Sequence, residues 1–88
     1  MLKLTKHDLI FLSRLEIDVE ILAVPQQGKS DMKAYWIMKV CTNRHGYRQE
    51  GILHGARGEE RRFLQLNALV RACKDYIPNC QKITVQIP

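Results

Sequence analysis

Most of the charged side chains in this chain are basic. Its 88 residues include 14 lysines and arginines against nine acidic residues, which gives a net charge of +5. Such an excess favours polyanionic partners, either DNA or RNA or an acidic protein surface. The candidate nucleic-acid-binding residues lie in a loop, in a hairpin turn and around the start of a predicted helix: Lys29, Lys33, Arg44, His45, Arg48, Arg57, Arg61 and Arg62.

These basic residues have two interpretations, which the sequence leaves open. If they meet at one edge of the fold, they form a phosphate-binding surface, and Arg57 with Gly58 at a helix N-terminus would suit a phosphate. In the other interpretation, the arginines near the helix are only its solvated face and Trp36 belongs to the core of the sheet. The aromatic residues that would stack on bases in the first interpretation are Tyr35, Trp36 and Tyr47.

Histidines and cysteines form no catalytic or metal-binding constellation. The pairs Cys41-x3-His45 and Cys73-x6-Cys80 lack the spacing of paired C-x2-C zinc ligands. The glycines do not spell a nucleotide fingerprint, and no acid, base and nucleophile can be assembled. We therefore predict a protein that is not an enzyme and holds no metal and no cofactor.

Cysteine usage and hydropathy bear on the compartment. An odd number of three cysteines without framework spacing predicts reduced thiols. No stretch approaches the roughly 18 to 20 apolar residues of a membrane span, and the N-terminal residues lack the apolar core of a signal peptide. We predict a cytoplasmic protein with no membrane partner.

The elements that must position the basic residues follow one another within a single domain, residues 1–88. An N-terminal helical arm, residues 1–16, contains a short helix from Thr5 to Leu15, where Thr5 and Asp8 form a capping box. The core, residues 17–88, follows the pattern β-β-β-α-β. Its expected elements are a strand over 18–24 stopped by Pro25, a central strand over 34–42, a turn over 43–46, a strand over 47–56, a helix after Gly58 that ends before Pro78, and a strand over 82–87.

This order predicts an α/β (α+β) fold, a mixed sheet with the long helix packed on one face. A helix between two strands acts as a crossover, so the last strand should pair in parallel with an earlier one. Residues 18–24 are the expected partner of that last strand.

Residues 18–88 resemble the first half of the ribonuclease H-like fold. Val-Glu-Ile-Leu-Ala-Val-Pro over 19–25 looks like its first strand, 34–56 like its hairpin, 62–70 like its helix and 80–87 like its fourth strand. The metal-binding carboxylates of that family fall here on Val24, Gln65 and Ile87, none of which holds a cation. The resemblance therefore implies a truncated family member without the two-metal chemistry, which needs several converging oxygen ligands.

Two further hypotheses stay open. An α-β-β-β-α order is similar to the double-stranded-RNA-binding domain, although the final strand is surplus and the lysine cluster of its second helix is missing. The second is a protein-interaction factor, such as an inhibitor or adaptor encoded by a phage or plasmid. It would act through an exposed edge at 47–56 or through the apolar face of Leu9, Leu12 and Leu15, and it includes self-association into a homodimer.

Overall fold

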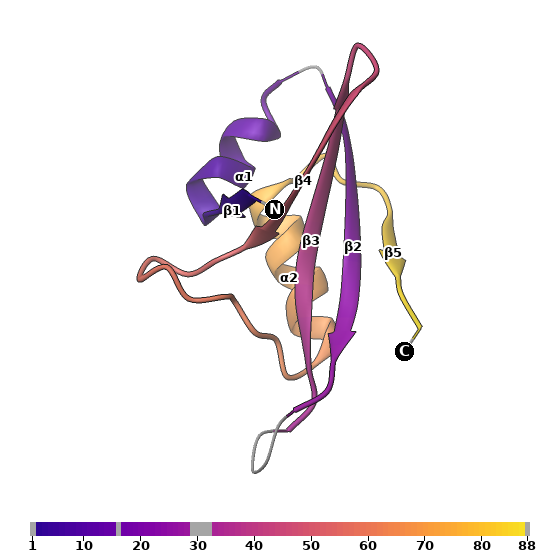
Figure 1. Ribbon diagram of the computed structural model, residues 1–88. Coiled ribbons are helices and arrows are strands. Elements are labelled where there is room, and N and C mark those ends of the chain that lie inside the picture. Colours follow the sequence, from indigo (N-terminus) through magenta and orange to yellow (C-terminus); the bar gives the residue numbers. More distant parts are fainter. Residues whose placement is uncertain (1, 16, 29–32, 88) are drawn as a thin grey trace.

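The computed structural model describes residues 2–15, 17–28 and 33–87, and these form a five-stranded mixed sheet with two helices (Figure 1). The strand order is β1-β4-β3-β2-β5, in which β1–β4 and β2–β5 are parallel and the two inner pairs are antiparallel. The elements are β1 (Leu2–Leu4), α1 (Lys6–Leu12), β2 (Asp18–Gln26), β3 (Tyr35–Arg44), β4 (Tyr47–Leu53), α2 (Leu66–Tyr76) and β5 (Ile83–Val85).

Both helices pack on the same face of this sheet. Ile21 and Ala23 of β2, two residues apart, point to that face together with their neighbours on β3, because side chains alternate along a strand. Leu9 of α1 and Leu69 of α2 are fully buried against them. The buried core cluster comprises Leu9, Ile21, Ala23, Met38, Val40, Leu53, Phe63, Leu69, Ala72, Cys73 and Ile77.

The opposite face of the sheet has no helix over it among the described residues. The central strand β3 is nevertheless apolar on both faces, as predicted, since Ile37 and Cys41 on this open face are as buried as Met38 and Val40 on the other. Long neighbouring side chains cover Cys41, which lies opposite Glu20 on β2 and Glu50 on β4.

Several predictions from the sequence are confirmed. The sheet is mixed, the hairpin turns at His45 and Gly46 with positive φ values of 54° and 79°, and β5 pairs in parallel with β2. Positive φ at both central residues is the geometry of a two-residue type I′ hairpin. The capping box is also present, because the Asp8 amide donates to Thr5 Oγ1 and the Thr5 amide donates to Asp8 Oδ2.

The N-terminal helix is shorter than predicted and does not lie free. It ends at Leu12, where the Ser13 hydroxyl donates to the Ile10 carbonyl at 2.6 Å and competes with the helical ladder. Leu9 is fully buried and Leu12 packs against the core, so these two residues of the predicted apolar face are covered, whereas Leu15 lies beyond the helix and is 37% exposed. Phe11 is 63% exposed.

Pro25 does not stop the second strand, which continues to Gln26. Pro25 lies opposite Trp36, whose backbone amide and carbonyl both bond to Phe63 on the other side of β3. The Trp36 backbone therefore needs no N–H donor from Pro25. Proline is tolerated in a sheet at positions where no such donor is needed.

Strand β1 was not predicted, and it changes the expected sheet edge. It pairs with Gly51–Leu53 of β4, so this end of the predicted open edge at 47–56 is covered. Gly51 permits the contact, because a Cβ atom there would lie 2.6 Å from Leu4 Cδ1 and 3.2 Å from the Leu2 carbonyl oxygen.

Candidate nucleic-acid interface

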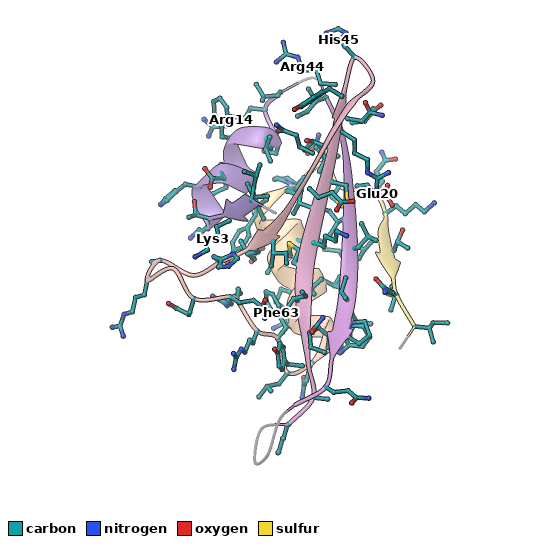
Figure 2. All side chains as sticks on the ribbon, viewed as in Figure 1. Lys3, Arg14, Glu20, Arg44, His45 and Phe63 are labelled. Carbon is teal, nitrogen blue, oxygen red and sulfur yellow. The ribbon has the colours of Figure 1, made fainter. Side chains whose placement is uncertain are left out.

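The predicted basic residues do not converge on one edge. Lys33 precedes β3, whereas Arg44 ends it, and ten strand residues hold them about 30 Å apart. Figure 2 shows Arg44 and His45 at the turn between β3 and β4, the far end of the sheet from the loop between β2 and β3. Lys29 lies outside the described residues. The predicted interface thus divides into separate regions.

The prediction that the long helix begins soon after Gly58 is also wrong. Helix α2 begins at Leu66, with Gln65 as an N-cap that makes no side-chain capping bond. The chain before it continues alongside the sheet instead, because Phe63 forms a two-way backbone bridge with Trp36. Arg57 and Gly58 are therefore not at a helix N-terminus, and Arg61 and Arg62 are not a helix face.

One basic region is the hairpin tip, defined by Arg44, His45 and Arg48. All three side chains are exposed at the end of the sheet, with His45 in the two-residue turn, Arg44 at the end of β3 and Arg48 near the start of β4. Tyr47 beside them is 71% exposed, so one of the predicted stacking residues is accessible here. Arg48 is held by Glu50, with its Nη2 atom 3.5 Å from Glu50 Oε1.

Glu50 also neutralises part of the open face behind the tip. Its Oε2 atom lies 3.2 Å from Lys39 Nζ. The hydrogen bond from Lys39 lowers the pKa of Glu50, the charges of Lys39 and Arg48 add to that shift, and desolvation opposes it. The open face is consequently a mixture of charges of both signs, with Asp18 and Glu20 on the adjoining β2 strand.

The second basic region is formed where the chain around β1 meets the chain after β4. We name it the basic flank and define it by six residues of segments 3–7 and 54–61. The His54 amide donates to the Leu4 carbonyl at 2.6 Å, which ties the two segments together. The basic flank comprises Lys3, Lys6, His7, His54, Arg57 and Arg61.

The loop that carries Arg57 and Arg61 is held by its own backbone. The Gly55 amide donates to the Glu59 carbonyl at 2.7 Å, and the Arg61 amide donates to the Leu53 carbonyl at 3.0 Å. Gly58 has a φ of 88°, a conformation that L side chains rarely adopt. The basic side chains of this region therefore project from a fixed frame, and Figure 1 shows their loop beside β1 and α1.

Arg62 and Tyr35 form a separate contact on the open face. The Arg62 guanidinium carbon lies 4.9 Å from the centroid of the Tyr35 ring, and the Tyr35 hydroxyl donates to Glu60 Oε1 at 3.4 Å. Trp36 is partly buried and packs against the core cluster, which confirms the interpretation that Trp36 belongs to the core of the sheet. Of the predicted stacking residues, Tyr47 is therefore the one that is largely exposed.

The cysteines are free thiols in the structure, as predicted. Burial, with a smaller contribution from the neighbouring Cys80, raises the pKa of the Cys73 thiol from 9.0 to about 12. The described residues bring together no group of three or more histidine, cysteine or acidic side chains that would hold a metal ion. Neither described helix is long and apolar enough to cross a bilayer.

Sequence reasoning missed four of the six residues of the basic flank. Lys3, Lys6 and His7 were assigned to an N-terminal arm, and His54 was assigned to a strand. The capping box at Thr5 predicted the start of α1. The three residues of β1, in contrast, contain no pattern that predicts a parallel pairing with a strand about fifty positions later. Only this long-range pairing places Lys6 next to His54.

Comparison with models of protein families, with curated proteins and with solved structures found no match to this chain.

Proposed function

We propose that this protein is a non-catalytic nucleic-acid-binding module whose main contact surface is the basic flank. The observation that carries this proposal is the meeting of segments 3–7 and 54–61, which gathers four lysines and arginines and two histidines on a hydrogen-bonded frame. Within the same segments, the acidic residues are Glu59 and Glu60, and Glu60 already accepts a hydrogen bond from Tyr35. Basic groups on a rigid frame are suited to phosphate contacts.

We further propose that the domain is a ribonuclease H-like half without catalytic carboxylates. Support comes from the order β4-β3-β2-β5, an antiparallel meander followed by a helix and a strand that is parallel to the first strand of the meander. The α1-β2-β3-β4-α2 order, with both helices on one face, supports the double-stranded-RNA-binding arrangement as the competing hypothesis. Both hypotheses place the function in binding.

The test is fluorescence anisotropy of labelled single-stranded DNA, duplex DNA, RNA and an RNA–DNA hybrid at two salt concentrations. We expect binding that weakens steeply with salt, because released counterions drive phosphate binding. Replacing Lys6, Arg57 and Arg61 together with glutamine should reduce affinity more than replacing the three tip residues. A folded protein that binds none of the four nucleic acids would overturn the proposal.

A second candidate function, pairing with a protein or a second copy, is favoured by the other edge of the sheet. Strand β5 pairs with β2 on one side, and its outer side has no strand partner among the described residues. Val85 is 43% exposed and Ile87 is 85% exposed there. Such an edge is open to strand addition. Light scattering tests this candidate, and a mass that stays monomeric at high protein concentration would exclude the homodimer.

A further inference from the structure

A pocket opens within the basic flank, between the start of α1, the end of β4, the following loop and the end of α2. Its volume is about 400 Å³. This is within the range of roughly 300–1,000 Å³ that is typical of small-ligand sites. The pocket thus has room for a ligand larger than a simple ion.

The polar side of this pocket is basic. Lys6 and His7 from α1 and His54 and Arg61 from the segment after β4 all line it, and its lining includes no acidic side chain. Four acidic residues adjoin this lining in the sequence or in space: Asp8 accepts hydrogen bonds from Thr5, Glu60 accepts one from Tyr35, the carboxylate of Glu59 approaches Gly55, and Asp75 precedes Tyr76. The site therefore suits an anion.

The rest of the pocket wall is apolar. Leu53, only 2% exposed, and the partly buried Tyr76 contribute to it. Lys6 Nζ lies 5.6 Å from the centroid of the Tyr76 ring, which places a cation next to an aromatic surface. Flat aromatic groups such as nucleobases pack on surfaces of this kind.

The ring of His54, the residue that follows β4, is oriented by a hydrogen bond to that strand. Its Nδ1 atom is 2.8 Å from the Ile52 carbonyl oxygen, and since a carbonyl only accepts, Nδ1 carries the hydrogen. The Nε2 atom is then left for a ligand. It accepts a hydrogen bond when the ring is neutral and donates one when the ring is protonated.

Other cavities of the described structure do not combine these properties. The cavity of about 290 Å³ between α1, β2 and the end of α2 has Asp18 in its wall and Lys82 as its only lysine or arginine. The hollow at the hairpin tip, which contains Arg44 and His45, also has Asp18 in its wall. Of these cavities in the described part of the chain, the flank pocket is the one that joins several basic groups to an apolar wall without an acid in its lining.

We infer that the flank pocket binds one unpaired nucleotide unit, with its phosphate at Lys6 and Arg61 and its base against the partly exposed Tyr76 ring. This inference rests on the proposed function and deepens it, because it names a preference for single strands. A paired base is stacked inside a duplex and cannot enter such a pocket without being extruded. The same unit occurs in a free mononucleotide and in a single strand.

The first experiment is isothermal titration calorimetry of the full chain with AMP, adenosine and inorganic phosphate. We expect measurable binding of AMP and much weaker binding of the two fragments, because each fragment fills only half of the site. In parallel, anisotropy should show tighter binding of a single-stranded 12-mer than of a duplex of the same sequence. AMP should compete more strongly with the single strand than with the duplex, because the duplex shares only the phosphate contacts and cannot place a base in the pocket.

The variants separate the pocket from the overall charge of the flank. Arg61→Gln should weaken AMP binding about tenfold, as expected for the loss of a charge-assisted hydrogen bond. Arg71→Gln, which removes the same charge from the exposed side of α2, is the matched control and should change it less than twofold. Ala56→Trp fills the pocket from its exposed rim without changing charge, and should abolish AMP binding while duplex binding persists.

Circular dichroism tests whether each variant is folded. If Ala56→Trp is unfolded, the comparison of Arg61→Gln with Arg71→Gln decides the result. Equal weakening by Arg61→Gln and Arg71→Gln, or no AMP binding, would overturn the pocket proposal. Nucleic-acid binding that is retained without AMP competition or strand preference would leave the proposed function intact and reject only the pocket. AMP binding without any oligonucleotide binding would reject the proposed function and assign the pocket to a free nucleotide.

Discussion

The basic flank and the hairpin tip carry similar charges on very different frames. The tip is a two-residue turn whose exposed arginine and histidine side chains border an open hollow, and the wall of that hollow contains the acidic Asp18 beside Leu15 and Ile17. The flank is concave, because three separate parts of the chain meet around a pocket with an apolar side. Charge attracts a polyanion to either region, whereas shape decides which part of it is recognised. The difference teaches that basic residues become a site through the packing behind them.

The largest expected effect comes from the core beneath the flank. Leu9→Ala removes a fully buried side chain that joins α1 to α2 and the sheet, and should lower the free energy of unfolding by about 2–5 kcal/mol. Urea denaturation measures this change. Phe11→Ala on the same helix is the control, and its 63% exposed side chain should matter little. Equal losses in both variants would show that α1 is not docked as described.

A smaller effect is expected at two glycines, of which Gly51 contacts β1 beside the flank and Gly46 lies in the turn of the hairpin tip. Gly51→Ala places a methyl group against Leu4 and should cost about 1–3 kcal/mol as β1 is displaced. Gly46→Ala at the tip meets no atom within 4 Å, and should cost about 1–2 kcal/mol through its positive φ alone. Calorimetry should then show AMP binding lost in Gly51→Ala and kept in Gly46→Ala. AMP binding that is kept in Gly51→Ala and lost in Gly46→Ala would show that the pocket does not depend on β1.

The helix cap at the entrance to the flank gives a third comparison. Thr5→Ala removes the hydroxyl that accepts from the Asp8 amide, and should lower the free energy of unfolding by about 1 kcal/mol. Thr5→Ser keeps the hydroxyl and should keep most of the stability. Thermal melts of both variants measure the difference. Identical melts would mean that the capping box contributes nothing to the fold.

The smallest effect is expected at the tip, where Glu50 restrains Arg48. Glu50→Gln should strengthen duplex binding by about twofold, since one more positive charge is released to phosphate. Lys39 lowers the pKa of Glu50, so the stability from their pair is present above the ordinary value of 4.5 and is lost as the pH falls through the lower folded value. The stability difference between wild type and variant should therefore be constant from pH 7 to about 5 and vanish in stronger acid.

The fold was more predictable than the site, because its signals are local. Alternating apolar residues gave β2 and β3, the turn residues gave the hairpin, and the apolar stripe of α2 gave the helix that joins β4 to β5. The start of α2 was misjudged, because Phe63 continues the apolar spacing of the helix although it pairs with Trp36 in the sheet. Periodicity alone cannot distinguish these two uses of one phenylalanine.

The flank depended on contacts that no local pattern contains. Lys6 and His54 are neighbours only because three residues of β1 pair with β4, and so short a strand has no periodicity of its own. The arginines of the loop were identified from their charge, while their surroundings were misassigned to a helix terminus. The chemistry of single residues was therefore predictable, and their assembly was not.

The two parallel pairings at the sheet edges also have a consequence for how the chain folds. The β3–β4 hairpin closes over a two-residue turn, whereas β1 with β4 and β2 with β5 each join segments about fifty or more positions apart. Contacts between distant segments form slowly, because a long loop must be closed before any of them stabilises the chain. We expect the hairpin tip to be structured early during refolding and the flank pocket to be completed among the last events.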